Sequence, residues 1–408
     1  MDKNHIIYLD NGDTSRMAPE VLESMLPFFT EHYGNPASLH QLGMEADERL
    51  SEARTVIADL IKAMPDELIF TSGATEANNL AILGLADYYQ SKKHILISGI
   101  EHSSVRETVR RLARRGYEIE EISVDGEGFL NISELESKIR PDTLLVSVIY
   151  ANYEIGTIQE ISKIGSLCRN KGVLFHSDAA QAFGRIMINV LTENIDLLTI
   201  NAHKIHGPKG VGALYVRKGV KIGKLLEGGA HENNRRPGSE NLPAIIGMAK
   251  AAEIAYQNLD AEHVYISALR DRLAKGLLEI PHVFYNGPKG ATLSSRLANN
   301  CDITFQYIEG EAILMHLSLR NICVSSGSAC SSKTLEPSHV LTAIGLKHEQ
   351  AHGSIRFTVS RYTTKEEVDE TVRNLKEVVE LLRSMSAFIP EKHSELLNPD
   401  AQTFYKER

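Results

Sequence analysis

Short apolar runs alternate with longer amphipathic segments along the first half of this chain, and that alternation limits the possible folds more than any other feature. The apolar runs are three to six residues long and lie at residues 68–71, 94–97, 144–148, 173–175, 195–200 and 211–216. Short, partly β-branched runs are typical of buried strands. Segments with helical periodicity lie at 45–61, 105–114 and 161–171. Strands alternating with helices predict an α/β fold whose sheet is mainly parallel and covered by helices.

The pattern changes beyond about residue 258. Helices are expected at 261–279, 308–319 and 365–382, and strands at 282–284, 302–305 and 354–358. We interpret this part as a smaller α+β domain. The predicted organisation is a large domain over 16–258, a small domain over 1–15 and 259–389, and a polar C-terminal tail over 390–408.

Composition excludes several classes of protein. The chain has 408 residues, 42% of them hydrophobic and 24% charged, as in an ordinary globular enzyme. Its formal net charge of -9 argues against a surface that coats nucleic acid. The first residues open no long apolar segment, so neither a signal peptide nor a membrane span is expected. The four cysteines form no close-spaced metal pair and no disulfide framework, which favours a reducing cytoplasm.

Lys204 lies in the segment 201–210, between the apolar runs 195–200 and 211–216. A lysine at the mouth between two buried strands can be held out of water. Desolvation lowers the pKa of a lysine and favours a free amine, which can form a Schiff base with a carbonyl compound. The alternative for this decapeptide alone is a solvated surface charge.

Further polar side chains follow the ends of predicted strands, where ligands bind in a parallel sheet. The turn at 71–76 leads from a strand into a helix, so its N–H groups and the Thr75 hydroxyl can hold an anion, although an ordinary capped helix fits as well. Asp178 follows another strand and could keep a ring nitrogen protonated. Gln181 and Asn152 add amides near the same edge. The alternative for Asp178 is a turn residue.

Three more residues are candidates for chemistry. His102 follows the strand at 94–97 and could stack on a flat ring or move protons, although a lone histidine is more often a surface residue. Cys330 lies in a run of small residues that predicts an accessible loop, where a thiolate can act as a nucleophile. Arg356 could clamp a substrate carboxylate or form a structural salt bridge. Cys301 and Cys323 neighbour strand-like sequence and are interpreted as structural.

Taken together, these residues resemble the cysteine desulfurases, which are pyridoxal-phosphate enzymes of the aminotransferase class V type. The resemblance runs from Tyr8 to about Leu382. Its motifs are Gly-Asn-Pro-Ala-Ser at 34–38, Thr-Ser-Gly-Ala-Thr-Glu-Ala-Asn-Asn-Leu at 71–80, Glu-His at 101–102, His-Ser-Asp-Ala-Ala-Gln at 176–181, Ala-His-Lys at 202–204 and Ser-Gly-Ser-Ala-Cys at 326–330. The last of these, with the segment 335–341, is characteristic of the long-loop subgroup.

The resemblance implies fold type I of the pyridoxal-phosphate-dependent transferases, with a seven-stranded type of sheet in the large domain. It implies pyridoxal 5'-phosphate contacts from Ala74, Thr75, Asn152, Asp178, Gln181, Asn201, His203, Lys204 and Ser239. In that scheme Lys204 carries the cofactor, Asp178 pairs with the ring nitrogen, His102 stacks on the ring, and Thr75 and His203 hold the phosphate. Ser239 reaches the phosphate of a neighbouring subunit, which implies a homodimer.

The same resemblance implies a reaction. Asn152 and Arg356 bind the carboxylate of L-cysteine, and Cys330 takes the sulfur as a persulfide and passes it to an acceptor protein, with alanine as the other product. Lys204, Cys330 and His102 form the implied catalytic set. Neither a membrane nor direct nucleic-acid binding is expected.

The chain departs from the family pattern at three places. The usually small, uncharged segment after the first strand contains Asp13, which Arg16 could neutralise. Asn201 replaces a common serine, and His231 replaces a glutamine. These departures leave room for two other readings: a related class V lyase or aminotransferase, and a low-activity scaffold derived from a desulfurase. A dehydrogenase is disfavoured because no Gly-x-Gly-x-x-Gly follows the first strand.

Overall fold

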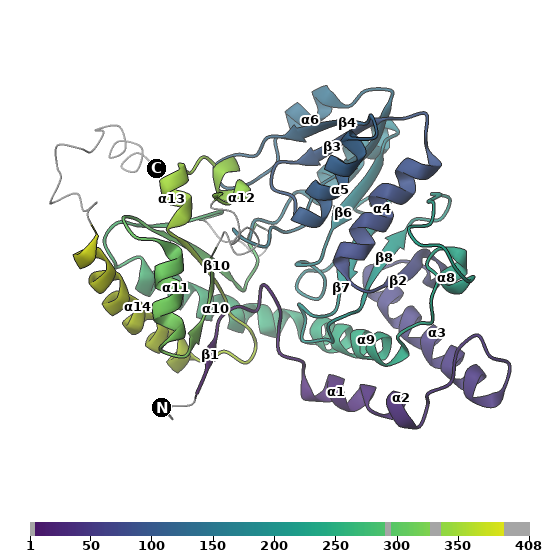
Figure 1. The fold of residues 1–408 in the computed structure, drawn as a ribbon, viewed down its shortest axis with the longest axis horizontal. Coiled ribbons are helices and arrows are strands. Elements are labelled where there is room, and N and C mark those ends of the chain that lie inside the picture. The colour runs from purple at the N-terminus through teal and green to yellow at the C-terminus, as the bar shows by residue number, and fades with distance from the viewer. Residues whose placement is uncertain (1–4, 290–294, 327–335, 387–408) are drawn as a thin grey trace.

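A seven-stranded sheet forms the centre of the larger part of the molecule (Figure 1). The computed structural model describes residues 5–289, 295–326 and 336–386. The strands, in sheet order, are β2 (Leu68–Thr71), β8 (Gly212–Val216), β7 (Leu197–Asn201), β6 (Leu174–Asp178), β5 (Thr143–Ser147), β3 (His94–Ser98) and β4 (Glu118–Ile122). Only β8 runs antiparallel to its neighbours β2 and β7. The predicted α/β fold with a mainly parallel sheet is therefore confirmed.

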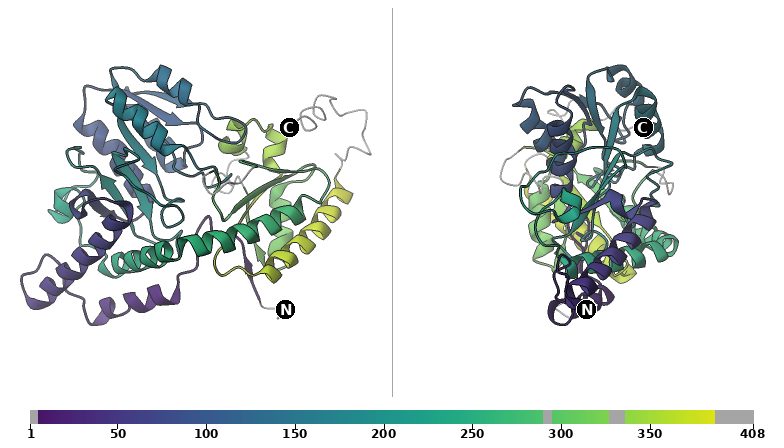
Figure 2. Two further views of the ribbon diagram at one scale, coloured as in Figure 1. Left: turned by 180° about the vertical axis from the view of Figure 1, so that it is seen from behind. Right: turned by 90° about the vertical axis from the view of Figure 1, so that its right-hand side faces the viewer.

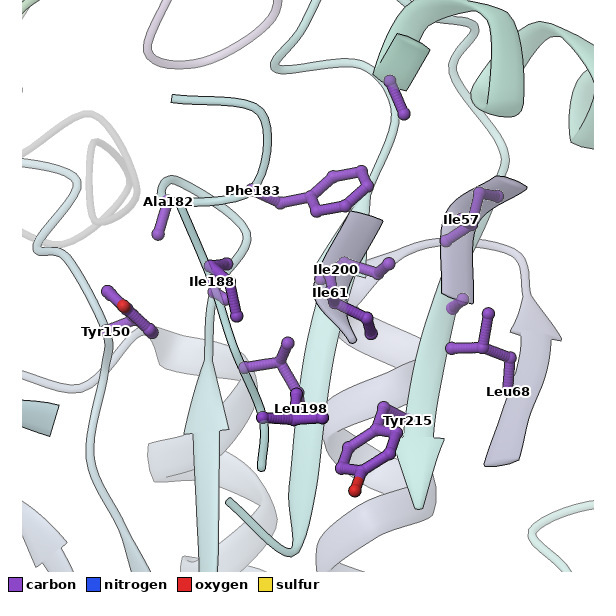
Figure 3. Close-up of a cluster of buried hydrophobic side chains, with 14 of the residues drawn as sticks. Ile57, Ile61, Leu68, Tyr150, Ala182, Phe183, Ile188, Leu198, Ile200 and Tyr215 are labelled. Atoms are coloured by element: carbon purple, nitrogen blue, oxygen red, sulfur yellow. The ribbon is translucent and has the colours of Figure 1, made fainter. Parts of the chain in front are cut away.

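Helices cover both faces of this sheet because its strands are apolar on both sides. Along β2, Leu68 and Phe70 join the apolar cluster that includes α3 (Gln41–Ile61), α7 (Ile161–Lys171) and α9 (Leu242–Gln257). The side chain between them, Ile69, joins the opposite cluster with α4 (Ala74–Tyr88) and α5 (Ser103–Ala113). Figure 3 shows part of the first cluster, in which Phe183, Ile200 and Tyr215 lie beside the strands.

Shorter elements complete this part of the chain. They are α1 (Pro19–Met25), α2 (Pro27–Thr30), η1 (Pro65–Glu67), α6 (Ile132–Lys138) and α8 (His231–Asn234). Among the described residues, no helix is both long enough and apolar enough to cross a membrane.

A second, antiparallel sheet has the order β12 (Ser325–Ser326), β13 (Ser354–Thr358), β10 (Asn300–Phe305) and β9 (Val283–Tyr285). The helices of this part are α10 (Leu259–Leu277), α11 (Gly310–Ser318), α13 (His348–His352) and α14 (Lys365–Met385). The short helix α12 (His339–Ala343) packs instead against Ile100, Ile149 and Ile155 of the larger part. The N-terminal strand β1 (Ile7–Tyr8) pairs with β11 (Ile322–Cys323). Accordingly, Ile7 and Leu9 share an apolar cluster with side chains from residues 269–379.

Helices α9 and α10 follow each other almost without interruption, since Asn258 alone separates them (Figure 2, left). Together they lead the chain from the seven-stranded sheet to the second sheet. The assignment of residues 16–258 to one domain, and of 1–15 with 259–389 to another, stays a prediction.

Candidate active site

Lys204 follows the end of β7, and its amine faces the turn after β1. The Nζ atom donates to the carbonyl oxygens of Gly12, at 2.5 Å, and of Asp13, at 2.7 Å. Burial, the largest influence, lowers the pKa of Lys204 from 10.5 to about 8. The carboxylate of Asp13 acts in the opposite direction. Lys204 is therefore a sheltered amine with an unusually accessible neutral form, and not a fully solvated charge.

Asp178 ends β6 and is 3% exposed. Its Oδ2 accepts a hydrogen bond from Asn78 Nδ2 at 2.7 Å, and its Oδ1 accepts one from the backbone N–H of Ala180 at 2.9 Å. Asn78 lies on α4, and the sequence analysis did not predict its part in this site. Two signals pointed to it: its place in the motif at 71–80 and its position one turn after Ala74 on the same helix. These two donors hold the Asp178 carboxylate in one orientation at the sheet edge.

His102 lies just before α5, and its Nδ1 accepts a hydrogen bond from the backbone N–H of Ser104 at 3.1 Å. Its ring meets the ring of Tyr153 edge-on, with centroids 5.4 Å apart. Burial lowers the pKa of His102, whereas the charge of Asp178 raises it. The net effect favours a neutral imidazole held at a fixed angle.

The amides of Gln181 and Asn152 are anchored to the backbone. Gln181 Nε2 donates to the Gly12 carbonyl at 2.8 Å, and its Oε1 accepts from Arg185 at 2.9 Å. Asn152 donates to the Ile100 carbonyl at 3.0 Å and accepts from two backbone N–H groups at 2.9 Å. Gln181 thus shares the Gly12 carbonyl with Lys204.

The start of α4 offers an uncapped helix terminus. Gly73 precedes the helix, and no described side chain bonds to the first-turn N–H groups as a cap. Ala74 is half-buried and Thr75 is exposed. Unbonded N–H groups and the helix dipole favour an anion such as a phosphate at this place.

The remaining predicted cofactor residues differ in their surroundings. His203 lies with its Nδ1 3.3 Å from the Thr14 hydroxyl, and burial lowers its pKa to about 4. The side chain of Ser239 is exposed. Asn201 is buried at the end of β7, and its Oδ1 has no hydrogen-bond partner among the described residues. A buried acceptor without a donor is costly in a finished core and marks a place where a ligand group can bind.

Arg356 lies on β13 and is engaged by carboxylates from the turn after β1. Its Nη2 donates to Asp13 Oδ1 at 2.7 Å and to Asp10 Oδ1 at 3.0 Å. The expectation that Arg16 neutralises Asp13 is wrong, because Asp13 pairs with Arg356, and the Arg16 guanidinium lies 6.0 Å from the Tyr362 ring centroid. Asp10 was not predicted as part of this site. Of the two alternatives that the sequence left for Arg356, the structure contains the salt bridge.

Cys330 lies outside the described residues, but both flanks of its segment are anchored beside the site. On one flank, β12 pairs with β13, and Ser325 lies opposite Arg356. On the other flank, Ser338 Oγ donates to a Glu154 carboxylate oxygen at 2.7 Å, and the His339 ring bonds to the Glu101 carbonyl at 2.9 Å.

Two of the other thiols are poor nucleophiles. Burial raises the pKa of Cys301 and of Cys168 to about 12. Cys323 is half-buried on β11, and burial raises its pKa as well. Their surroundings agree with a structural role.

The residues present fit pyridoxal phosphate. The cofactor has an aldehyde, a ring nitrogen and a phosphate, and the site offers an amine in Lys204, a carboxylate in Asp178 and an open helix terminus before Ala74. Asn78 Oδ1 on α4 and Asn201 Oδ1 at the end of β7 are buried and lack hydrogen-bond partners within the described part of the chain.

Comparison with known proteins agrees with this chemistry. The aminotransferase class-V family matches residues 7–371. A cysteine desulfurase IscS of Methanosarcina thermophila is 45% identical over 97% of both chains. A cysteine desulfurase IscS of Dictyoglomus turgidum is 47% identical over 94% of this chain and 97% of its own.

Solved structures give the same result. A NifS-like protein superposes with a TM-score of 0.86 at 36% identity, covering 93% of this chain and 100% of its own. The structure of SspA in complex with cysteine superposes with a TM-score of 0.77 at 34% identity, covering 88% of this chain and 100% of its own. The chain therefore belongs to the cysteine desulfurases, pyridoxal-phosphate-dependent enzymes of the aminotransferase class-V family.

Proposed function

We propose that this protein removes sulfur from L-cysteine, with Lys204 as the cofactor-bearing amine, Arg356 as the carboxylate-binding group and Cys330 as the sulfur acceptor. One observation supports this assignment most: the Lys204 amine has its pKa lowered to about 8 and lies at the sheet edge that also carries Asp178. The full-length likeness to cysteine desulfurases supports the substrate.

Each residue proposed to hold pyridoxal phosphate matches one chemical group of that cofactor. Lys204 would hold the aldehyde carbon, Asp178 would pair with the ring nitrogen, and the N–H groups at the start of α4 would bind the phosphate. When bound, pyridoxal phosphate supplies an electron sink that weakens the Cα–H and Cβ–S bonds of an attached amino acid. Asn78 fixes the Asp178 carboxylate through its 2.7 Å hydrogen bond, so that this carboxylate would be available to the ring nitrogen.

Lys204 also moves a proton. An amine with a pKa of about 8 is partly neutral near pH 7.5, so it can take the Cα proton of the substrate and return it. His102 is neutral and packs edge-on against Tyr153, so it can lie against a flat ring without adding charge.

The Cys330 thiolate attacks the substrate sulfur and forms an S–S bond while the Cβ–S bond breaks. The electron pair of the broken bond stays on carbon, which gains a proton, so the products are alanine and a Cys330 persulfide. The two flanks of its segment, at β12 and at Ser338, are anchored beside the site, which supports Cys330 as the attacking thiol.

The test compares wild-type holoenzyme with Cys330→Ala and Cys323→Ala. Alanine and protein-bound sulfane sulfur are measured after addition of L-cysteine, and the persulfide is mapped by mass spectrometry. We expect wild type and Cys323→Ala to give equal amounts of both products. Cys330→Ala should bind the cofactor but carry no persulfide, and normal sulfide output from that variant would contradict the assignment.

We also propose a homodimer. Ser239 is exposed, as a side chain that reaches a neighbouring subunit must be. Helices α1 and α2 expose Leu22, Leu26 and Phe29 at 47–59%, an apolar surface of the kind that subunit contacts cover. Light scattering at several concentrations tests this state, and a monomer at all of them would exclude it.

The persulfide has to leave Cys330 before the next turnover. We propose that an acceptor protein takes the terminal sulfur through its own thiol. Transfer of radiolabelled sulfur from the loaded enzyme to a reduced thiol protein tests this step.

A further inference from the structure

The Asp13 carboxylate binds Arg356, the same side chain that the proposed function assigns to the substrate carboxylate. Its Oδ1 accepts a charge-assisted hydrogen bond from Arg356 Nη2 at 2.7 Å. Burial pulls the pKa of Asp13 upward, but the charge and hydrogen bonds of Arg356 outweigh it, so the net pKa is lowered and the carboxylate is ionised at neutral pH.

Asp13 and Asp10 share Arg356 but differ in exposure. The side chain of Arg356 is 4% exposed, that of Asp10 is 20% exposed, and that of Asp13 is 45% exposed. Asp13 therefore lies close enough to solvent to move away from Arg356, whereas Asp10 is more enclosed. The Arg356 Nε atom is buried without a partner among the described residues, so the guanidinium still has a donor for an additional carboxylate oxygen.

The backbone of the same residue contacts the other reactive group. The Asp13 carbonyl accepts a hydrogen bond from Lys204 Nζ at 2.7 Å. One short segment, Gly12 with Asp13, thus engages both the amine and the guanidinium that L-cysteine needs.

We propose that Asp13 is a built-in substrate mimic: its carboxylate sits on Arg356 until the carboxylate of the incoming amino acid displaces it. This inference rests on the proposed function of Arg356. Displacement of one carboxylate by another costs the charge-assisted hydrogen bond of the first, so Asp13 raises the KM for L-cysteine and selects against weakly bound carboxylates. Asp13 is a specificity-determining residue in this scheme and takes no part in bond breaking.

The experiment compares holoenzymes of wild type, Asp13→Asn and Asp13→Ala. The matched control is Asp369→Asn, which removes a carboxylate on α14 from an exposed ion pair with Arg272 on α10. We expect both Asp13 variants to lower the KM for L-cysteine by about tenfold, the effect of roughly one charge-assisted hydrogen bond. The kcat should not fall, and Asp369→Asn should match wild type.

A second measurement isolates the carboxylate. 3-Mercaptopropionate keeps the thiol and carboxylate of cysteine but lacks its amine, so it cannot form a Schiff base and its binding reports on the carboxylate site. Its dissociation constant, measured by calorimetry, should fall by about the same tenfold in both Asp13 variants. Thermal unfolding of each variant confirms that the protein is folded.

Two results would overturn the inference. One is an unchanged or raised KM in both Asp13 variants with kcat retained, which would make Asp13 a positioning residue for Arg356. The other is an unchanged dissociation constant for 3-mercaptopropionate. If wild type forms no alanine from L-cysteine, the proposed function fails, whereas the calorimetric comparison still decides whether Asp13 competes for Arg356.

Discussion

The lowered pKa of Lys204 predicts how the apoprotein takes up its cofactor. Only the neutral amine attacks an aldehyde. With a pKa of about 8, roughly a fifth of the Lys204 amines are neutral at about pH 7.4, against about one in a thousand for the ordinary value of 10.5. Burial should therefore accelerate cofactor attachment at this pH by roughly 250-fold relative to a solvated lysine.

The assay mixes apoprotein with pyridoxal phosphate between about pH 6 and about pH 10 and fixes the product with borohydride. The modified peptide is then quantified by mass spectrometry. The sign follows from the acid–base chemistry: attachment rises as pH increases through about 8 and then levels off. Lys204→Arg should show no attachment, and the exposed neighbour Lys209 provides the control Lys209→Ala, which should keep the wild-type profile.

A midpoint near 10.5 would refute the reasoning, because Lys204 would then behave as a solvated amine. Attachment to another lysine would refute it as well. Asp13→Asn adds an internal check: the Asp13 carboxylate raises the pKa of Lys204, so its removal should move the midpoint to lower pH.

Three further predictions concern buried groups. Burial raises the pKa of Glu101 from 4.5 to about 8, so the folded state holds an extra proton between these pH values. The free energy of unfolding should therefore fall as pH rises through this window. Urea midpoints at about pH 5 and about pH 8 measure this dependence, which Glu101→Gln should lose. Glu232 is 6% exposed and pairs with Arg54 at 2.6 Å, so Glu232→Ala should lower the free energy of unfolding by about 3–5 kcal/mol. A decrease below about 1 kcal/mol in a denaturant titration would contradict this prediction. The thiols of Cys168 and Cys301 should resist iodoacetamide in the native state because burial raises their pKa values to about 12, and rapid labelling of either would show that the core opens readily.

The strands and helices that were predicted from the sequence are those whose burial produces a clear hydrophobic pattern along the chain. Strands β2, β5, β7 and β8 are buried along their whole length, and their short apolar runs show it. Strand β4 was not predicted because it is an edge strand, and its charged residues pair at the surface, as Glu118 does with Arg140. Helix α9 was not predicted because most of its residues are buried, so it lacks the polar face that marks an amphipathic helix.

The same distinction holds for the site. Lys204 and Asp178 lie at strand ends, where the order of strands in a parallel sheet already indicates a ligand edge. Asn78 and Asp10 act through partners that are 100 and 346 residues away along the chain, and no local pattern reports such contacts. The wrong pairing of Asp13 with nearby Arg16 has the same cause, since its partner Arg356 lies 343 residues away.

One carbonyl group can report on the state of the whole site. The Gly12 oxygen accepts hydrogen bonds from both Lys204 and Gln181, and its N–H donates to the Thr358 hydroxyl at 2.7 Å. When Lys204 reacts with an aldehyde, the Gly12 oxygen loses this donor and keeps only the hydrogen bond from Gln181, so the frequency of its C=O stretch should rise. An isotope label at the Gly12 carbonyl would therefore allow infrared spectroscopy to detect cofactor binding without measuring turnover or visible absorbance.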